Sequence, residues 1–465
     1  MANSRKSKSG SIFRKAESVL REQIKAGAHL TAGLSGGVDS VVLLDLLDQL
    51  SAQMQFSLSA IHVNHGISGN ADKWSEFCLD LCRSRSIPLT IATLKISREP
   101  GDSLEALARD ERYRVFGELK TDYVVLAQHL DDQAETLLLQ LLRGAGVKGL
   151  GAMPVVRNLA IEVKTQLVTS RSLPRILRPM LEVSRREIED YAREHALKWI
   201  TDESNDNLSF DRNLLRHEFF PLLEKRFPSY RTTFLRASRH MAEASTLLDE
   251  LAEADGNACL VQGKLHVEDL RKLSFPRAKN LLRYTLVQQG AILPSTTRLE
   301  EILRQLLCSR QDAKLNISFG NAEVRCFQGV VHVRHIDEQR ALGSRSREWE
   351  LAWHGEKRLV IDELGGTLEF IPRKGAGISL RKLSENPVTI RPRQGGERLR
   401  PDQKRPRRSV KNLLREASLP PWERETLPLI FSGNQLVCVP GMGVDCAFQA
   451  VAEEPGLMVE WQANK

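Results

Sequence analysis

Two adjacent glycines near the start of the chain separate an apolar run from an amphipathic run, within residues 34–40, Leu-Ser-Gly-Gly-Val-Asp-Ser. This order predicts a strand, a tight turn and a helix start. The first helical turn offers unpaired backbone N–H groups and the positive end of the helix dipole, and glycines let an anion approach the backbone. With the hydroxyls of Ser35 and Ser40, the segment predicts a phosphate cradle, and a glycine turn without a ligand is the alternative. No Lys follows the glycines, which separates the segment from loops that grip β- and γ-phosphates.

Carboxylates open a second predicted helix, within residues 127–136, Ala-Gln-His-Leu-Asp-Asp-Gln-Ala-Glu-Thr. Asp131 or Asp132 would cap this helix, and Asp132 and Glu135 would share one side of its first turn. Two carboxylates beside a phosphate cradle can bind Mg²⁺, orient a cation or take a proton from a nucleophile. Plain helix capping is the alternative.

Basic and amide side chains form two further candidate groups. Arg109 and Arg112 stand three residues apart on a predicted helix, where arginines could stabilise charge in phosphoryl or nucleotidyl transfer, or form an exposed salt-bridged face. The segment 211–216, Asp-Arg-Asn-Leu-Leu-Arg, could read phosphates and base edges, or cap and solvate a helix. His62 and His65 flank Asn64 after a strand, and we interpret them as polar lining or core residues rather than metal ligands.

Apolar strands and helical patterns alternate along residues 20–220. The strands are expected at 28–34, 56–63, 89–94, 123–127 and about 175–179, and the helices at 38–50, 72–85, 103–119 and 132–143. This alternation predicts an α/β fold, a doubly wound and mostly parallel sheet. Ligands bind at the carboxyl ends of strands in such sheets, which is where the candidate residues lie.

Three domains are expected. Residues 1–221 would form the α/β catalytic domain, residues 222–336 a mainly helical domain with a short β-rich end at 323–333, and residues 349–465 a small α+β domain. Charged, Gly and Ser residues between 337 and 348 indicate a linker.

Charge is concentrated in one segment of an otherwise balanced chain. The 465 residues carry a formal net charge of +8, and residues 391–415 contain ten Lys/Arg and two acids, so the remainder nets zero. This predicts a local contact with a polyanion, with a solvated charged face as the alternative. Seven scattered cysteines, no apolar run of membrane-spanning length and no signal-peptide pattern predict a cytoplasmic location without a membrane partner.

The motifs in this order resemble the tRNA(Ile)-lysidine synthase family, which belongs to the pyrophosphate-loop ATPase group. The resemblance covers nearly the whole chain, is weakest over 222–345, and rests on LSGGVDS (34–40), HVNHGI (62–67), AQHLDDQAET (127–136), RGAGVKGLGAMP (143–154), TDESNDNLSFDRNLLR (201–216), RPRQGGERLRP (391–401) and LPPWERETLPLI (419–430). Asn64 stands where we expect an Asp in the family, which puts a role of that carboxylate in doubt here.

The resemblance implies an enzyme that uses ATP and Mg²⁺. It would adenylate the wobble cytidine of a tRNA(Ile) with a CAU anticodon and release pyrophosphate. The amine of free lysine would then displace AMP and leave lysidine. A homodimer is one possible oligomeric state.

The resemblance also implies roles for individual residues. ATP would be bound by Ser35, Gly36, Gly37, Val38, Asp39 and Ser40. Asp39 would also hold Mg²⁺, Asp132 and Glu135 would bind and help deprotonate lysine, and Arg112 would stabilise the adenylated intermediate. The tRNA would be bound by Arg212, Asn213, Arg216, Arg391, Arg393, Arg398 and Arg400.

Three other functions compete with this interpretation. A tRNA thiolase could use the same loop, but thiolases generally need cysteines to carry sulfur, and the chain has no Cys-x-x-Cys. A small-molecule synthetase would not need the basic segment, and a non-enzymatic RNA-binding protein would not need Asp39.

Overall fold

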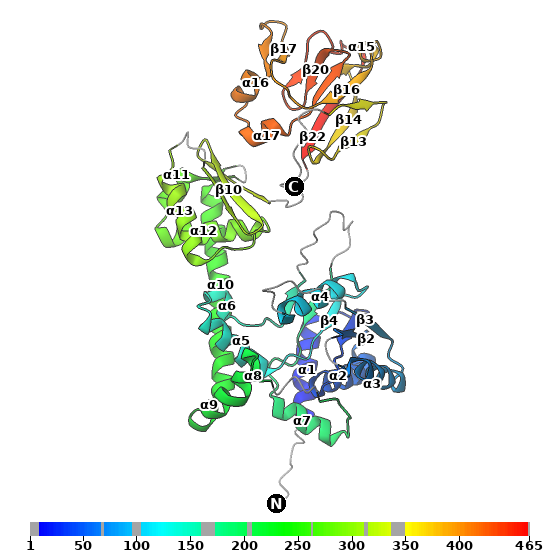
Figure 1. The fold of residues 1–465 in the computed structure, drawn as a ribbon, viewed down its shortest axis with the longest axis vertical. Helices are drawn as coiled ribbons and strands as arrows, with labels where there is room; N and C mark the ends of the chain where they lie inside the picture. The colour runs from blue at the N-terminus through cyan, green and yellow to red at the C-terminus, as the bar shows by residue number, and fades with distance from the viewer. Residues whose placement is uncertain are drawn as a thin grey trace, which may run out of the picture. The chain divides into compact units, whose positions relative to one another are not determined.

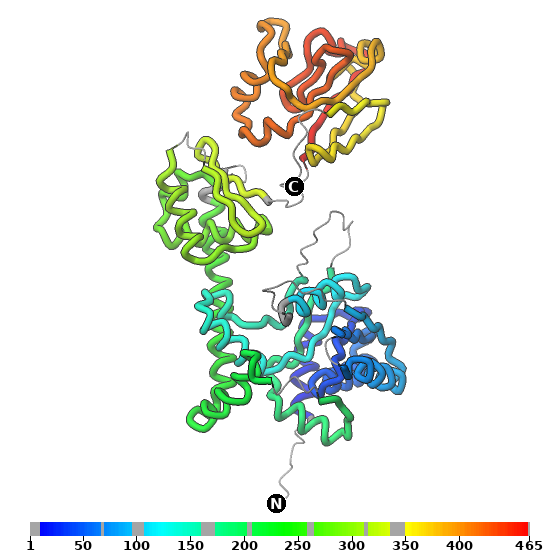
Figure 2. Tube along the Cα trace, in the orientation of Figure 1, coloured from blue at the N-terminus to red at the C-terminus, as the bar shows by residue number. Residues whose placement is uncertain are grey.

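The computed structural model describes residues 9–66, 69–94, 104–159, 173–201, 207–261, 264–310, 315–335 and 349–463 (Figures 1 and 2). The chain divides into two compact units, Met1–Leu251 and Ala252–Lys465. The expected linker at 337–348 lies outside the described residues, and the three expected domain boundaries stay a prediction. None of the described helices combines the length and hydrophobicity that a bilayer crossing needs.

A six-stranded sheet forms the centre of the first unit. Its spatial order is β3 (Leu89–Thr93), β2 (Ser57–Asn64), β1 (His29–Gly33), β4 (Tyr123–Val125), β6 (Arg175–Leu177) and β5 (Val156–Asn158). All neighbours pair in parallel except β5 with β6. The strand order reverses between β1 and β4, so their following loops flank a crevice at the carboxyl edge. The predicted doubly wound α/β fold is confirmed, while the antiparallel edge strand β5 was missed.

Helices cover both faces of this sheet (Figure 1). One core joins the sheet to α1 (Ser9–Gln23), α2 (Val38–Met54), α3 (Ala71–Ser84) and α7 (Arg185–Glu194). A second core on the opposite face joins Val124 of β4 to Phe116 of α4 (Leu104–Glu118). Because helices cover both faces, the central strand β4 is buried at every position, whereas the edge strand β3 is partly exposed.

The remaining helices of this unit pack against α5 (Leu130–Leu142). They are α6 (Val147–Leu150), α8 (Asp211–Leu214), the π-helix η2 (Leu215–Phe219), α9 (Phe220–Arg226) and α10 (Tyr230–Cys259). Ala134 and Leu138 of α5 share a core with Leu215, Phe220 and Tyr230. This core sets the position of η2 relative to the start of α5.

The second unit contains more sheet than the sequence indicated. An antiparallel sheet, β7 (Leu260–Val261), β8 (Lys264–His266), β11 (Val330–His335), β10 (Ala322–Phe327) and β9 (Leu315–Phe319), packs with α11 (Val267–Lys272), α12 (Phe275–Gln288) and α13 (Thr296–Cys308). The β-rich end predicted at 323–333 is present as β10 and β11. The strand β8, which pairs with β11, lies more than sixty residues earlier in the chain and was not predicted. Only two residues of β8 pair in register with β11, which is too few to leave a recognisable sequence pattern.

The C-terminal part of this unit is α+β. One sheet runs β12 (Leu351–Trp353), β16 (Val388–Arg391), β19 (Leu429–Ser432), β20 (Gln435–Val439), β21 (Gly443–Val444), and a second runs β13 (Arg358–Ile361), β14 (Gly366–Lys374), β22 (Pro455–Ala463), β15 (Ile378–Ser379). The hairpin β17 (Arg398–Leu399) and β18 (Arg408–Ser409) leads into α16 (Val410–Glu416), and α15 (Leu380–Leu383) and α17 (Pro421–Glu425) complete the set.

A buried polar network ties α7 to α2. The hydroxyl of Tyr191 donates to Asp45 Oδ2 at 2.7 Å and accepts from Gln49 Nε2 at 2.9 Å. The guanidinium of Arg85 lies 2.7 Å from Asp45 Oδ1. The network holds the helix that follows the glycine turn against the helix that carries Arg185.

Replacing Tyr191 by Phe removes one donor to the buried Asp45. We expect the variant to lose about 1–3 kcal/mol of stability, seen as a lower midpoint of urea unfolding. Tyr284→Phe, which loses a hydrogen bond to Glu253 at the surface, is the control and should unfold close to wild type. Equal midpoints for Tyr191→Phe and wild type would contradict the role of the network.

Candidate active site

The glycine turn after β1 is braced by its own hydroxyls. Ser40 Oγ donates to the carbonyl of Gly37 at 2.9 Å and accepts from the amide of Ser35 at 3.2 Å, while Ser35 Oγ lies 3.1 Å from Ser40 Oγ. Gly37 is the N-cap of α2, and no side chain caps it. The first amides of α2 therefore keep the free N–H groups that suit an anion.

Gly36 adopts a conformation that other residues avoid. Its φ is 87°, and a Cβ there would lie 2.9 Å from Ile200 Cδ1 and 3.4 Å from Cys78 Sγ. Its carbonyl also accepts from the amide of Ile200 at 2.9 Å. The turn thus rests directly on Ile200 and Cys78, and only glycine fits without strain.

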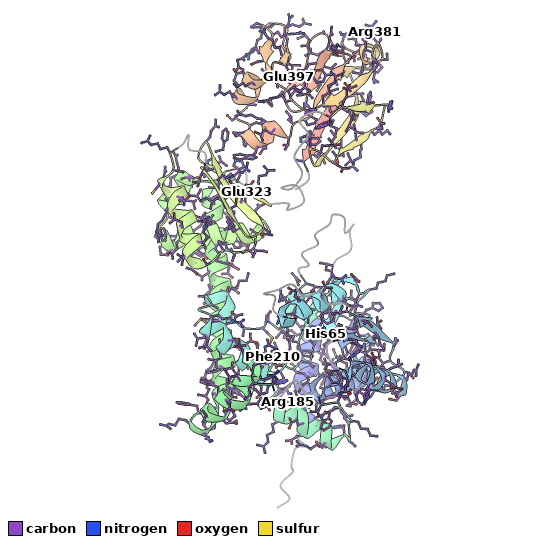
Figure 3. The ribbon with its side chains drawn as sticks, viewed as in Figure 1. His65, Arg185, Phe210, Glu323, Arg381 and Glu397 are labelled. Carbon is purple, nitrogen blue, oxygen red and sulfur yellow. The ribbon has the colours of Figure 1, made fainter. Side chains whose placement is uncertain are left out.

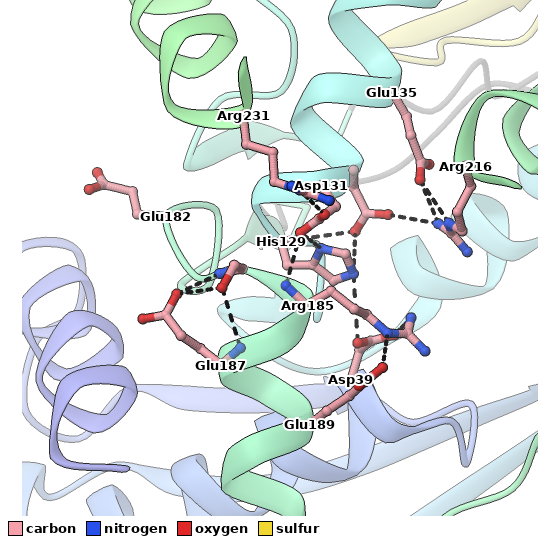
Figure 4. Close-up of polar contacts among 12 residues, drawn as sticks. Asp39, His129, Asp131, Glu135, Glu182, Arg185, Glu187, Glu189, Arg216 and Arg231 are labelled. Carbon is pink, nitrogen blue, oxygen red and sulfur yellow. Dashed lines mark hydrogen bonds and ion pairs between the residues drawn. The ribbon is translucent and has the colours of Figure 1, made fainter. Parts of the chain in front are cut away.

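The buried imidazole of His129 lies at the centre of the carboxylates. His129 directly precedes α5, and its side chain is 2% exposed. Its Nε2 lies 3.6 Å from Asp39 Oδ1 and 3.5 Å from Asp132 Oδ2, and its Nδ1 lies 3.7 Å from Asp131 Oδ2 (Figure 4). The structure therefore brings the loop after β1 and the loop after β4 together through His129, which the sequence analysis placed in a candidate segment without giving it a role. Its position directly after an apolar strand was the available signal.

Asp39 faces this group from the first turn of α2. Its Oδ2 accepts from Arg185 at 3.0 Å, whereas its Oδ1 is buried and lacks a hydrogen-bond partner within the described structure. Burial raises the pKa of Asp39 above its usual value, although His129 and Arg185 oppose that shift. The free oxygen suits a ligand that supplies positive charge.

Asp131 serves as an anchor instead. It accepts from the backbone amide of Arg185 at 2.9 Å and pairs with Arg231, which also bonds to Glu224. Burial would raise the pKa of Asp131, but the amide of Arg185, His129 and Arg231 outweigh burial, so the pKa lies below its usual value. Asp131 therefore joins α5, α7 and α10 as a permanent anion.

Glu135 and Asp132 share one guanidinium. Glu135 is 1% exposed, and its Oε1 accepts from Arg216 Nε at 2.9 Å and lies 2.7 Å from Arg216 Nη2. Asp132 Oδ1 lies 3.6 Å from the same Nη2, and Asp132 Oδ2 accepts from the amide of His129 at 2.9 Å. Burial raises the pKa of Glu135, against the effect of Arg216. Glu135 Oε2 is buried without a hydrogen-bond partner among the described residues.

Other predicted site residues have different surroundings. Arg112 interacts electrostatically with His65, which is labelled in Figure 3, and burial together with the charge of Arg112 lowers the pKa of the imidazole. Asn213 is buried and donates to the carbonyl of Asn207 at 2.9 Å. The roles proposed for Arg112, Arg212 and Asn213 stay predictions.

Asn64 has a local structural role. Its amide nitrogen donates to Ser75 Oγ at 3.2 Å, and its oxygen accepts from the amide of Gly66 at 2.8 Å. These bonds hold the turn after β2 against α3. The Ser75 hydroxyl donates to the carbonyl of Ala71 at 3.0 Å, so an amide can donate to it while a carboxylate would require it to give up that bond.

The basic segment of the second unit is built around a buried acid. Asp445 is 2% exposed and accepts from the amides of Arg400 at 3.0 Å and Ala447 at 3.1 Å, and from Arg407 Nη2 at 3.1 Å. These bonds hold the loop between β17 and β18 in place. In the preceding turn, Glu397 Oε1 accepts from the amides of Gln394 and Gly395 at 2.6 and 2.7 Å (Figure 3).

Four arginines of this segment were predicted to contact tRNA. Arg398 and Arg400 are exposed. Arg391 and Arg393 are partly buried, and Arg391 pairs with Glu350 at 2.9 Å. The exposed pair is the more accessible to a polyanion.

Family models match three stretches of the chain. They describe a PP-loop domain over residues 9–223, a TilS substrate binding domain over 265–332 and a TilS substrate C-terminal domain over 388–461. The doubly wound sheet with the cradle after β1 thus defines an ATP-binding domain of the PP-loop class.

Two of the most similar curated proteins belong to one family within this class. The tRNA(Ile)-lysidine synthase of Nitrosomonas europaea is 50% identical over 96% of this chain and 94% of its own length. That of Coxiella burnetii is 36% identical over 95% of each chain. The chain belongs to the tRNA(Ile)-lysidine synthase family and is an ATP-binding ligase that modifies tRNA. Among solved structures, a U34-tRNA thiolase from Methanococcus maripaludis aligns over 50% of this chain and 79% of its own, with a TM-score of 0.42 and 21% identity.

Gly36→Ala should damage the cradle. A left-handed conformation costs a non-glycine residue about 1–2 kcal/mol, so we expect a lower thermal midpoint and roughly 5–30-fold weaker ATP binding. Gly37→Ala is the matched control for stability, because Gly37 has a φ of −70° and the nearest atom to its Cβ position is Ser35 Oγ at 3.5 Å. A stable, tightly binding Gly36→Ala variant would overturn this account.

Asp445→Ala should loosen the basic loop. Each backbone amide that loses its acceptor costs about 1–3 kcal/mol of local stability, so hydrogen exchange of residues 400–407 should accelerate. Glu363→Ala removes an exposed carboxylate outside this loop and is the control. Similar exchange rates in both variants would show that Asp445 does not order the loop.

Proposed function

We propose that this enzyme joins free lysine to the wobble cytidine of a tRNA(Ile) with a CAU anticodon, through an adenylated cytidine. The products are lysidine, AMP and pyrophosphate. The observation that carries the proposal is the convergence on His129 of Asp39, next to the phosphate cradle, and Asp132, next to Glu135. An ATP site and a site for an amine thus share one buried residue.

ATP would bind with its pyrophosphate at the start of α2, against Gly36, Gly37, Val38 and the hydroxyls of Ser35 and Ser40. Mg²⁺ fits Asp39, whose buried Oδ1 has no hydrogen-bond partner in the described structure. Among the residues that the structure describes, no group of three or more His, Cys, Asp or Glu side chains could hold a metal ion alone. This agrees with Mg²⁺, which proteins often bind through one or two carboxylates and substrate phosphates. The ion would offset the negative charge of the leaving pyrophosphate.

The lysine amine would bind at Asp132 and Glu135. An ammonium group cannot attack carbon until it loses a proton, so a carboxylate within hydrogen-bond reach is required. Burial raises the pKa of Glu135, which makes it a better base than an exposed carboxylate. Arg112 is proposed to stabilise the adenylated cytidine.

The tRNA would make two kinds of contact. Its backbone would bind the basic segment through Arg391, Arg393, Arg398 and Arg400, and its anticodon would approach Arg212, Asn213 and Arg216. A base in a single-stranded loop can leave its stack at low cost, so the anticodon suits this chemistry. Binding through phosphates should weaken steeply with salt.

The thiolase alternative has little support from the cysteines beneath the cradle. Burial raises the pKa of Cys78 to about 12 and that of Cys82 to about 11. Both thiols therefore stay protonated at neutral pH, and a thiol is a far weaker nucleophile than a thiolate.

The test is incubation of the enzyme with tRNA(Ile) bearing CAU, ATP, Mg²⁺ and labelled lysine. We expect lysine in the tRNA and equal amounts of AMP and pyrophosphate. Glu135→Gln should lower the rate at least about 100-fold, the scale of one lost electrostatic contact to a transition state. Glu118→Gln alters an exposed carboxylate at the end of α4 and should retain wild-type activity. Binding of ATP and tRNA without lysine transfer by wild type would refute the proposal.

A further inference from the structure

Arg216 was predicted to contact tRNA, but its guanidinium pairs with the proposed lysine-binding carboxylates. Two of its nitrogens converge on Glu135 Oε1, and Nη2 also faces Asp132 Oδ1. Arg216 itself remains one third exposed. It therefore lies between the buried carboxylates and the surface from which substrates arrive.

The contacts of Arg216 occupy the carboxylate oxygens that a second cation would use. Of the four oxygens of Asp132 and Glu135, Arg216 faces one on each residue and the amide of His129 donates to a third. The fourth, Glu135 Oε2, is completely buried. An incoming ammonium group must therefore compete with Arg216 for Glu135 Oε1 and Asp132 Oδ1.

The side chain of Arg216 projects from an irregular helical turn whose core residues, Leu215 and Phe220, stay packed against α5. Arg216 belongs to η2, one π-helical turn between α8 and α9. Single π-helical turns are rare and often occur at functional sites. The neighbouring side chains Leu214 and Phe219 are exposed. A phosphate of a bound tRNA is the natural alternative partner for a guanidinium released here.

We propose that Arg216 is a positioning residue that sets the order of substrate binding. Without tRNA it pairs with Glu135 and Asp132 and excludes lysine, and on tRNA binding it moves to a phosphate and uncovers the carboxylates. The inference rests on the proposed function, because it takes these carboxylates as the lysine site. By thermodynamic linkage, lysine must then strengthen tRNA binding by the same factor as tRNA strengthens lysine binding.

The experiment measures the dissociation constant of labelled lysine by equilibrium dialysis, with and without tRNA(Ile) bearing CAU. A non-cleavable ATP analogue with a methylene group between the α- and β-phosphates prevents turnover. For wild type we expect tRNA to tighten lysine binding roughly 5–150-fold, the usual range of coupling between sites. Arg216→Gln should bind lysine tightly without tRNA and show no further gain when tRNA is added.

Two further variants keep the result interpretable. Arg239→Gln removes an exposed arginine that pairs with Glu182 in the same unit, and it should retain the wild-type coupling. Arg216→Lys keeps the charge but cannot place two nitrogens on Glu135, so its coupling should be intermediate even if Arg216→Gln fails to fold. Weaker lysine binding in Arg216→Gln would show that Arg216 only orients Glu135. Coupling equal to wild type in both Arg216→Gln and Arg216→Lys would overturn the proposal. If wild type ligates lysine but the expected changes in coupling are not seen, only the role of Arg216 is wrong. If wild type ligates no lysine, the proposed function itself is wrong.

Discussion

The pairing of buried carboxylates with arginines is the constraint on which the rest of this structure depends. Asp39, Asp131 and Asp132 surround one buried imidazole at the carboxyl edge of the sheet, and Glu135 follows Asp132 in the first turns of α5. Ionised groups taken out of water are costly unless they are paired. Arg185, Arg216 and Arg231 supply the pairing, and they come from α7, η2 and α10. The helices that follow the sheet are thus required for the charge state of the site, in addition to their packing.

The same environment separates the carboxylates into two groups. Asp131 is saturated with donors and has a lowered pKa, so it stays charged and acts as an anchor. Asp39 and Glu135 have raised pKa values, and each keeps one oxygen without a hydrogen-bond partner in the described structure. Groups with a free oxygen and a pKa shifted toward neutrality are the ones suited to bind ligands or exchange protons.

Local pattern was sufficient for much of the fold. The strand–helix alternation predicted β1 to β4 and β6, and the two-glycine motif predicted the turn and the start of α2, because these depend on neighbouring residues. The three-residue edge strand β5 and the two-residue strands β7 and β15 were missed, since they are defined by partners far away in the sequence. The departure at Asn64 was visible in the sequence, but its contacts with Ser75 and Gly66 were not.

The sequence by itself determined the family, the phosphate-binding turn after the first strand, and the presence of an acidic helix start near it. Only the tertiary structure decided that His129 joins these two loops, that Asp131 is an anchor, and that Arg216 meets Glu135. The ion pairs of Glu135, Asp131 and Asp39 join residues 81, 100 and 146 positions apart. No local pattern encodes such distances, because they arise when the strand order reverses and separate helices pack against the same edge.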